Sequence, residues 1–430
     1  MATTKKGQLM SGNRSQPATA RRGGLAAVTC SLTRKARRTI IAGATTAALA
    51  AGLLAAAAGP ATAATLPPIS FTGQPNGSFG PAPLGAGQSL TYTVANDTAI
   101  STYLTMSITG STDFSIVGPA STCTNYTTPG HTLLKDETCT VVVRFAPTTL
   151  GPVTAQLNVT ASVGGNVFVS LSGTGYANLI WSNVVSYMTP QSGTLAAAVV
   201  NGSTTTLRES IPGQSEPAGI AADSSHLYWA GYGNGTIMES NRDGSNPHAI
   251  VSGQNMPWGM AVNSNHLYWT DLGGGTVMEA NLDGTGAQVI ETGQAYPAGI
   301  TLDGSHLYWA DYSSGLIMKA NLDGSNPQAI VSGRRSPMGV AVTSSHIYWT
   351  EFYNGTVMDA NLDGTSVQQI AYTVGRPAGI VVDAGTLFWV DEDNMTADQT
   401  SGMINAANLD GSNVRTLISG QPLPWGLLAY

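Results

Sequence analysis

The chain has 430 residues, enough for two or three domains with a sizeable core, and only 10% of them are charged. Its 51 glycines and 22 prolines are typical of an all-β protein rich in hairpins. Nine of the 18 basic residues lie in the first 64 residues, which hold no acidic residue, so the rest of the chain carries 9 basic against 25 acidic side chains. This acidic balance argues against nucleic acid or an anionic membrane surface as a partner.

Residues 1–64 resemble a secretory signal segment. A basic run, Arg34–Arg38, precedes an apolar stretch that ends near Ala58, and Ala61-Thr62-Ala63 suits signal cleavage. The Arg37-Arg38 pair leaves twin-arginine export open beside the general secretory route. A retained membrane anchor is the alternative to cleavage. We therefore expect a secreted, extracellular or cell-surface protein, with no stable membrane insertion after signal removal.

Residues 65–176 alternate apolar and polar side chains over short runs, which predicts half-buried antiparallel strands. The runs are Leu90–Val94, Tyr103–Ile108, Thr140–Phe145, Ala155–Val159 and Val167–Leu171. Their spacing predicts an Ig-like β-sandwich. Cys123 and Cys139 remain after signal removal, and two cysteines in an exported chain are expected to pair. Such a disulfide would add roughly 3 kcal/mol of stability.

The order of short motifs in this region resembles the bacterial Ig-like domains called choice-of-anchor D, relatives of the ASH/MSP sandwich group. The resemblance rests on Asp113–Ile116, the two cysteines, Phe145–Pro147, Gly151 and the ending Leu171–Gly175. It implies a spacer or display module of exported bacterial proteins that has no chemistry of its own. Residues 176–178 follow as a short linker, which predicts a restricted arrangement of the two domains.

From residue 177 to the end, the chain repeats a unit of about 40 residues. An apolar motif ends in tryptophan at Trp181, Trp229, Trp269, Trp309, Trp349 and Trp389. Five units open with a Pro-x-Gly step, at Pro217, Pro257, Pro297, Pro337 and Pro377, and carry an N-x-D-G turn. Each unit reads as four short strands, and a repeat of this kind is typical of a β-propeller blade.

The two ends of the repeat region complement each other. The first unit lacks a Pro-x-Gly strand, and the chain finishes on one, Pro424–Tyr430. Pairing this strand with the first unit would give six blades and leave no open sheet edge. The sequence therefore predicts an all-β fold, with an Ig-like β-sandwich at residues 65–176 followed by a six-bladed β-propeller at residues 177–430, closed by the C-terminal strand.

The third unit carries a family motif. Its segments His266–Asp271 and Val277–Gly284 resemble the YWTD repeat of the low-density-lipoprotein receptor family, and the likeness spans all six units. The resemblance implies a six-bladed propeller that binds protein ligands and is not an enzyme. Only the third unit keeps Tyr-Trp-Thr-Asp itself.

Residues that recur in the units are expected to build the scaffold. The tryptophans should pack between neighbouring blades, and the acids of the N-x-D-G turns should cap their own turns. Histidines at 226, 266, 306 and 346 would be rotated around the ring, too far apart to share a metal ion. Acids that follow the tryptophan motif suit hydrogen bonds between blades, with ligand binding as the alternative; they are Asp271, Asp311, Glu351 and Asp391. We expect no metal site, no cofactor and no catalytic residue.

The repeat changes length in one kind of loop. From the tryptophan to the glycine of the next strand, units two to five take six residues, but unit one takes 12 and unit six takes 13. Ring closure would make these two long loops neighbours on one face. With the loops that enter the first strands, they supply the candidate ligand-binding residues: Tyr187, Met188, Arg334, Arg335, Arg376, Asp391, Glu392, Asp393, Asp398 and Trp425. The alternative is that long loops merely tolerate insertion.

These features favour an exported, non-catalytic recognition protein, monomeric, that binds an extracellular protein or glycan on the long-loop face. One alternative is a lactonase- or lyase-like propeller enzyme with an acidic centre able to hold calcium. Another is a structural component of a wall or matrix whose propeller has no specific ligand.

Overall fold

The protein is seen here in a computed structural model that describes residues 69–73, 76–163, 165–184, 193–202, 204–392 and 401–430, with the backbone alone at residues 209 and 210. This part of the chain is all-β apart from two short 3-10 helices, η1 (Gly118–Ala120) and η2 (Thr122–Tyr126). None of its helices is long and apolar enough to cross a membrane. The expected signal segment, 1–64, lies outside the described residues, so that assignment stays a prediction.

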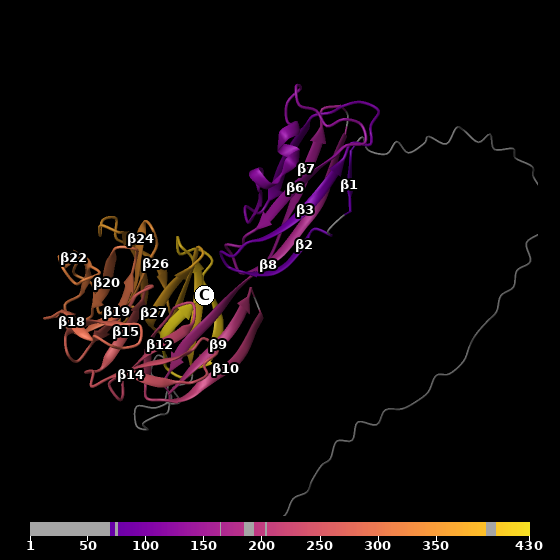
Figure 1. The fold of residues 1–430 in the computed structure, drawn as a ribbon. Helices are drawn as coiled ribbons and strands as arrows, with labels where there is room; N and C mark the ends of the chain where they lie inside the picture. The colour runs from indigo at the N-terminus through magenta and orange to yellow at the C-terminus, as the bar shows by residue number, and fades with distance from the viewer. Residues whose placement is uncertain (1–68, 74–75, 164, 185–192, 203, 393–400) are drawn as a thin grey trace, which may run out of the picture. The chain divides into compact units, whose positions relative to one another are not determined.

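The strands before residue 176 form two sheets (Figure 1). In one sheet the order is β1 (Ser70–Thr72), β3 (Gln88–Ala95), β6 (Thr138–Phe145) and β5 (Phe114–Ile116). In the other, β7 pairs on either side with β4 and β8, and β2 runs parallel to β8; these strands are β2 (Ser78–Pro83), β4 (Leu104–Gly110), β7 (Gly151–Ala161) and β8 (Gly165–Asn183).

One hydrophobic cluster draws side chains from both of these sheets. Tyr92, Val141 and Leu157 are fully buried in it, and the ring of Phe114 stacks on that of Phe145 with centroids 4.8 Å apart. The predicted disulfide is confirmed: Cys123 and Cys139 are bonded, which ties η2 to β6. All five predicted strand runs lie within or overlap the observed strands. In each run apolar and polar residues alternate, which matches the alternation of side chains between the two faces of a sheet.

The predicted linker is a strand instead. Residues 176–178 lie inside β8, which continues without a break to Asn183. Tyr176 accepts a hydrogen bond from the backbone of Leu84, whereas Ala177 and Asn178 pair with β9. Because each of these residues finds a ladder partner, the extended conformation satisfies their backbone groups better than a loop would.

Units two to six form five separate four-stranded antiparallel sheets, one for each repeat, with strands paired in chain order. The sheets of units two to four contain β11 (Pro217–Ala222), β12 (His226–Gly231), β13 (Thr236–Asn241) and β14 (His248–Ser252); β15 (Pro257–Val262), β16 (His266–Asp271), β17 (Thr276–Asn281) and β18 (Gln288–Glu291); β19 (Pro297–Leu302), β20 (His306–Asp311), β21 (Leu316–Asn321) and β22 (Gln328–Val331). Those of units five and six contain β23 (Pro337–Val342), β24 (His346–Glu351), β25 (Thr356–Asn361) and β26 (Gln368–Tyr372); β27 (Arg376–Asp383), β28 (Thr386–Glu392), β29 (Gly402–Asn408) and β30 (Arg415–Gln421).

The last strand pairs with the first unit, as the sequence predicts. Leu427 of β31 (Pro424–Ala429) lies opposite Trp181 of β8, and β8 then pairs with β9 (Gly193–Asn201), which pairs with β10 (Thr204–Gln214). The first strands of successive sheets contact one another in chain order, and β31 contacts both β27 and β11. In Figure 1, β15, β19 and β27 accordingly lie nearer the middle of this part, and β14, β18 and β22 lie nearer its edge.

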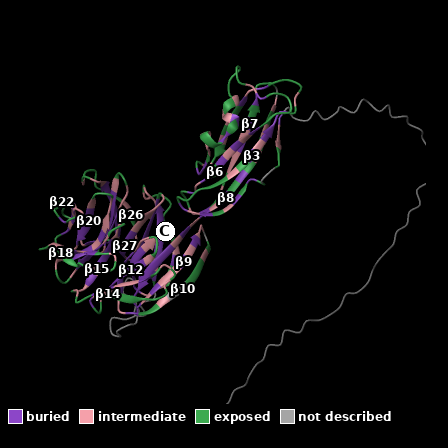
Figure 2. Cartoon of the chain, in the orientation of Figure 1, coloured by how far each residue is buried: buried purple, intermediate pink, exposed green. Residues whose placement is uncertain are grey.

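All six recurrent tryptophans are fully buried, which confirms their assignment to the core. Four of their indole N–H groups donate to a residue outside the predicted motif, a glutamine three positions before the Pro-x-Gly step. Gln294, for example, accepts from the Trp309 indole at 2.9 Å, and Gln214, Gln254 and Gln421 do the same for Trp229, Trp269 and Trp181. Figure 2 shows the general pattern, with buried residues along the strands and exposed residues at the turns.

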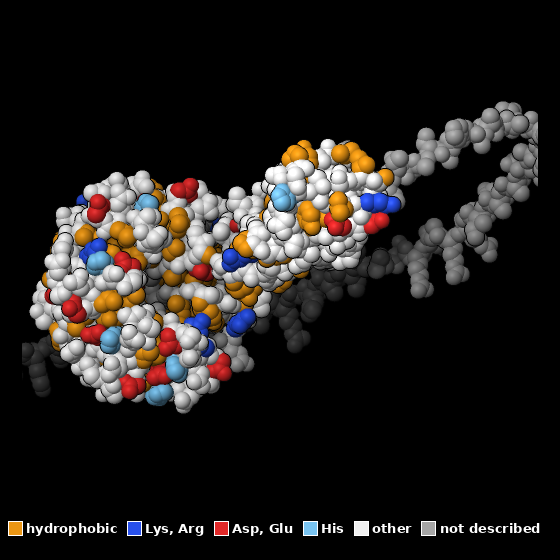
Figure 3. Space-filling view, turned by 45° about the horizontal axis from the view of Figure 1, so that its top comes forward, with side chains coloured by type: hydrophobic (Ala, Val, Ile, Leu, Met, Phe, Trp, Pro, Cys, Tyr) orange, Lys and Arg blue, Asp and Glu red, His pale blue; other side chains and the backbone are white. Residues whose placement is uncertain are grey.

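The N-x-D-G acids cap their own turns, as expected. The Asp323 carboxylate accepts from both the backbone and the hydroxyl of Ser325, and four other turns repeat this arrangement. Three of the recurrent histidines lie beside acids of their own units, such as His226 at 3.3 Å from Glu239, whereas His346 contacts the hydroxyl of Ser345. Figure 3 shows histidine and charged side chains spread over one face of this part, with hydrophobic side chains exposed between them.

Candidate ligand-binding site

One face of the repeat sheets collects aromatic side chains at two kinds of position. The first is the residue after the opening proline of a first strand, occupied by Trp258 in β15 and by Trp425 in β31. The second is the turn that follows a second strand, which supplies Tyr232, Tyr312, Phe352 and Tyr353. Antiparallel pairing places the start of a first strand beside the end of the second, as Pro257 opposite Asp271 shows, so both kinds of position open on the same face.

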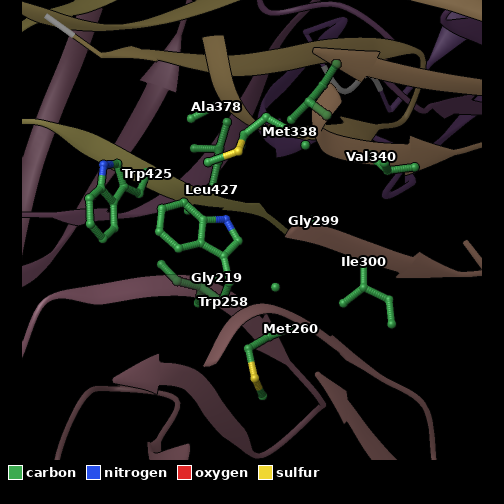
Figure 4. Close-up of a pocket in the computed structure, with 16 residues that line it drawn as sticks. Gly219, Trp258, Met260, Gly299, Ile300, Met338, Val340, Ala378, Trp425 and Leu427 are labelled. Carbon is green, nitrogen blue, oxygen red and sulfur yellow. The ribbon is translucent and has the colours of Figure 1, made fainter. Parts of the chain in front are cut away.

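Three of these side chains form an aromatic group. The rings of Trp258 and Trp425 lie 4.5 Å apart between centroids at 38°, and Tyr232 meets both edge-on, at 5.4 and 5.6 Å. Figure 4 shows Trp258 and Trp425 beside each other, with Met338 close by. Trp425 is buried, whereas Trp258 and Tyr232 are half-buried, so the group presents aromatic surface to solvent and is anchored beneath.

A second aromatic group carries a positive charge. Phe352 lies between Tyr312 and Tyr353 in edge-on and tilted contacts of 5.3 to 6.4 Å, and Tyr353 is 66% exposed. The Arg376 guanidinium stands over Phe352 at 5.5 Å and over Tyr353 at 5.6 Å. Burial, and next a hydrogen bond with Tyr353, raise the pKa of Tyr312 to about 12. The Arg376 cation lies over two aromatic faces, where cation–π attraction stabilises it.

A buried carboxyl group connects the two aromatic groups. Burial raises the pKa of Glu392 to about 8, while the charge of Arg376 and a hydrogen bond from the Trp425 indole act in the opposite direction. Its neighbour Asp391 accepts a hydrogen bond from Asn405 at 2.7 Å, yet burial still raises the pKa of Asp391 to about 7. Around neutral pH, Glu392 is therefore mainly protonated, and it can donate a hydrogen bond as well as accept one.

Together these side chains make a continuous set, which we call the mouth cluster: Tyr232, Trp258, Tyr312, Phe352, Tyr353, Arg376, Glu392 and Trp425. Beneath it lies a central cavity of about 60 Å³, enough for only a few water molecules. The residues that line this cavity are glycines and apolar side chains, among them Met260, Ile300 and Val340 (Figure 4). The acidic centre expected of the enzyme alternative is not found in this lining.

Glycine is required around the cavity. A Cβ placed on Gly259 would lie 2.5 Å from the carbonyl oxygen of Ala298, and one on Gly426 would lie 2.2 Å from that of Ala218. The same holds for the other Pro-x-Gly glycines, at 219, 299, 339 and 379, each against the next first strand. The Pro-x-Gly step therefore allows the first strands to approach closely below the mouth cluster.

The structure brings together three of the candidate residues from the sequence: Arg376, Glu392 and Trp425. Asp391 is nearby but buried and bonded to Asn405. Arg334 donates to Glu351 at 2.6 Å and lies over the Trp349 ring, so its charge is engaged in the scaffold, whereas Arg335 is exposed. Four candidates lie outside the described residues, together with most of both long loops: Tyr187, Met188, Asp393 and Asp398.

The acids after the tryptophan motif hold the connections between sheets. Asp271 and Asp311 each accept a backbone N–H from the segment that enters the first strand of their own sheet, at Asn255 and Ala295. This agrees with the structural interpretation of these acids. Within the described residues, no group of three or more His, Cys, Asp or Glu side chains is arranged to hold a metal ion.

Sequence reasoning missed five members of the mouth cluster, namely Tyr232, Trp258, Tyr312, Phe352 and Tyr353. Their signal is present in the repeat, at positions where the residue type changes from unit to unit. After the opening proline the units carry Ala, Trp, Ala, Met, Ala and Trp, and after the acid or glycine that ends the second strand they carry Tyr, Leu, Tyr, Phe and Glu. Large side chains at positions that the scaffold leaves free indicate a binding surface.

Comparisons with known proteins agree with the fold. A family model described as Cep192 domain 4 matches residues 67–176. A comparison with curated proteins finds no match. Among solved structures, the chain is similar to one in a crystal structure of a nidogen/laminin complex, with 19% sequence identity and a TM-score of 0.50, over 59% of this chain and 98% of that one. This likeness and the repeated four-stranded sheets support a YWTD-like β-propeller fold in the C-terminal part of the chain.

Proposed function

We propose that this chain is an exported, non-catalytic recognition protein in which an Ig-like β-sandwich, residues 65–176, precedes a six-bladed β-propeller, residues 177–430. Five four-stranded sheets and the group β31-β8-β9-β10 would be the six blades, since their first strands contact one another in a closed order. The family match over residues 67–176 agrees with the first boundary. Residues 1–64 would be the export signal, and the disulfide suits an oxidising compartment.

The observation that carries the binding proposal is the mouth cluster. Tyrosine, tryptophan and arginine dominate the binding energy of protein interfaces because they bury large areas with little loss of side-chain entropy. Here they lie side by side over a cavity too small for a substrate, so a ligand would bind across the face. The proposed ligand is an extracellular protein or glycan, and the similar propeller comes from a complex between two proteins.

A capture experiment tests the proposal. The mature protein, residues 65–430, would be immobilised and exposed to the extracellular fraction of the cells that produce it. A double variant, Tyr353→Ala with Arg376→Ala, removes the exposed Tyr353 and the half-buried Arg376 from the cluster and should recover much less of any ligand. The matched control is Phe168→Ala, because Phe168 is another exposed aromatic residue, 59% exposed, that lies in β8 outside the cluster. Equal capture by the double variant and the wild type would contradict this placement of the site.

A further inference from the structure

A second concave surface lies on the side of the repeat sheets, away from the mouth cluster. It is a groove of about 500 Å³ between the sheet portion β8-β9-β10 and the second sheet, within the size range of small-molecule sites. Its floor is apolar, made by Ile180, Leu195, Ala197, Leu207, Ile211 and Leu227. Three of these side chains, Ile180, Leu195 and Leu227, belong to the hydrophobic cluster around Trp229, and Ala197 and Ile211 pack against it. We call this surface the side groove.

The repeat explains the chemistry of this groove. A groove of similar size, about 490 Å³, lies beside the corresponding turn of unit three, and its lining includes Glu239 and Leu282. In the N-x-D-G turns of units three to six the second residue is leucine, and each leucine packs against the hydrophobic cluster that its sheet shares with the preceding sheet; these are Leu282, Leu322, Leu362 and Leu409. In unit two the same position is Arg242. Its guanidinium instead stands 4.0 Å from the centre of the Tyr430 ring and donates to the carbonyl oxygen of Asp223.

The turn itself also contacts its neighbour differently. In units three to six the turn glycine packs on the backbone carbonyl of an isoleucine in the preceding sheet, as Gly284 does on Ile250. In unit two, Gly244 faces the side chain of Ile211 and no backbone atom. The turn therefore stands further from β10 than its counterparts stand from their neighbours. The side groove therefore differs from its counterparts in the contacts of this turn as well as in the residue at position 242.

Two positive charges border the apolar floor. Arg208 and Arg242 both line the side groove, and neither forms an ion pair with any residue that the structure describes. The third charged residue in the lining is Asp243, whose carboxylate caps its own turn through Ser245. In a chain whose mature part is acidic, two guanidinium groups that have no ion-pair partner among the described residues are an unusual combination beside an apolar groove. They suit an anionic group attached to an apolar body.

We propose that the side groove binds one small amphipathic carboxylate, of the fatty-acid class. Its hydrocarbon chain lies on the floor between β10 and β12, where burial from water supplies the affinity. Its carboxylate pairs with Arg208 and Arg242, which set the preference for an anion. The Tyr430 ring holds the Arg242 side chain in place by its cation–π contact. This site is separate from the mouth cluster, and each can fail without the other.

Calorimetric titration of the mature protein with dodecanoate, below the concentration at which it forms micelles, tests the proposal. The expected result is saturable binding of one dodecanoate per chain. Dodecyltrimethylammonium has the same hydrocarbon chain with a cationic head, and it should bind at least tenfold more weakly. Absent binding, equal affinity for both amphiphiles, or many weak sites without saturation would overturn the proposal.

The repeat supplies a matched variant. Arg242→Leu restores the leucine of the other units, so it should remove one positive charge from the groove, preserve folding and weaken dodecanoate binding at least tenfold. Arg335→Leu makes the same substitution at an exposed site elsewhere and should leave the affinity unchanged. Arg208→Gln, at the exposed end of the groove, should also weaken binding and decides the matter if Arg242→Leu does not fold. Unchanged affinity in a folded Arg242→Leu or Arg208→Gln variant would contradict the assignment.

Discussion

Each of the six recurrent tryptophans has a buried indole N–H group that needs a hydrogen-bond acceptor. A fully buried indole N–H without a partner loses its hydrogen bond to water, which costs free energy of folding. Glutamine three positions before the Pro-x-Gly step supplies the partner in four of the six cases. Where Arg334 replaces it, the acid of the next motif is Glu351 instead of aspartate, and the longer side chain reaches the guanidinium at 2.6 Å. The change from glutamine to arginine at position 334 is therefore accompanied by a change from aspartate to glutamate at position 351.

Gln294→Ala should consequently destabilise the protein although Gln294 touches no ligand. It leaves the N–H of the fully buried Trp309 without its 2.9 Å acceptor, which should lower the free energy of unfolding by about 1–3 kcal/mol. Denaturant unfolding measures this. Gln328→Ala, the same change at an exposed position of β22, should have little effect. Equal stability of both variants would refute the role given to this glutamine.

Glu392 should give the protein a dependence of stability on pH. Its pKa is about 8 in the folded state against an ordinary value of 4.5, so folding takes up a proton between these values. Its stabilising contribution is therefore full below about pH 4.5 and declines as the pH rises towards about 8. Asp391, with a pKa of about 7, acts in the same direction.

Unfolding measured from pH 5 to pH 8.5 checks this prediction. The free energy of unfolding of Glu392→Gln should fall less steeply over this interval than that of the wild type, because glutamine does not titrate. Identical slopes in both proteins would show that Glu392 keeps an ordinary pKa.

At the scale of the elements, the Pro-x-Gly step positions the first strands. The proline is the first or second residue of each strand, and the glycine lets the next strand approach where a Cβ would meet a carbonyl oxygen. Gly259→Ala should therefore force β15 and β19 apart and cost about 1–3 kcal/mol. Gly304→Ala is the control, because nothing lies within 4 Å of a Cβ placed there. Thermal unfolding compares the two; a Gly259→Ala protein as stable as the control would show that the ring tolerates wider spacing.

Most elements follow from the sequence because each unit repeats the same local signals. The four short strands predicted for each unit agree with the five four-stranded sheets, and the pairing of the last strand with Trp181 follows from the missing first strand of unit one. Residues 176–178 were misjudged as a linker because their partners, Leu84 and β9, are remote in sequence. The site was predicted only in part, because its signal lies in single residues that differ between units, such as Trp258, and not in the length of the loops.

For the whole molecule, the repeat separates scaffold from site. Positions that stay constant bury indoles, cap turns and let first strands approach. Positions that change supply the mouth cluster on one face and, through Arg242, the side groove. The cluster combines aromatic surface, a cation and a carboxyl group that is mainly protonated near neutral pH, a set that suits the proposed ligand recognition. The proposed ligand would bind across this face.

The most direct test is the affinity of the ligand recovered by capture, measured for the wild type and for the Tyr353→Ala, Arg376→Ala double variant. If the mouth cluster binds the ligand, the double variant should have a dissociation constant at least tenfold higher, while Phe168→Ala should match the wild type. A dissociation constant for the double variant within twofold of the wild-type value would show that the ligand binds elsewhere.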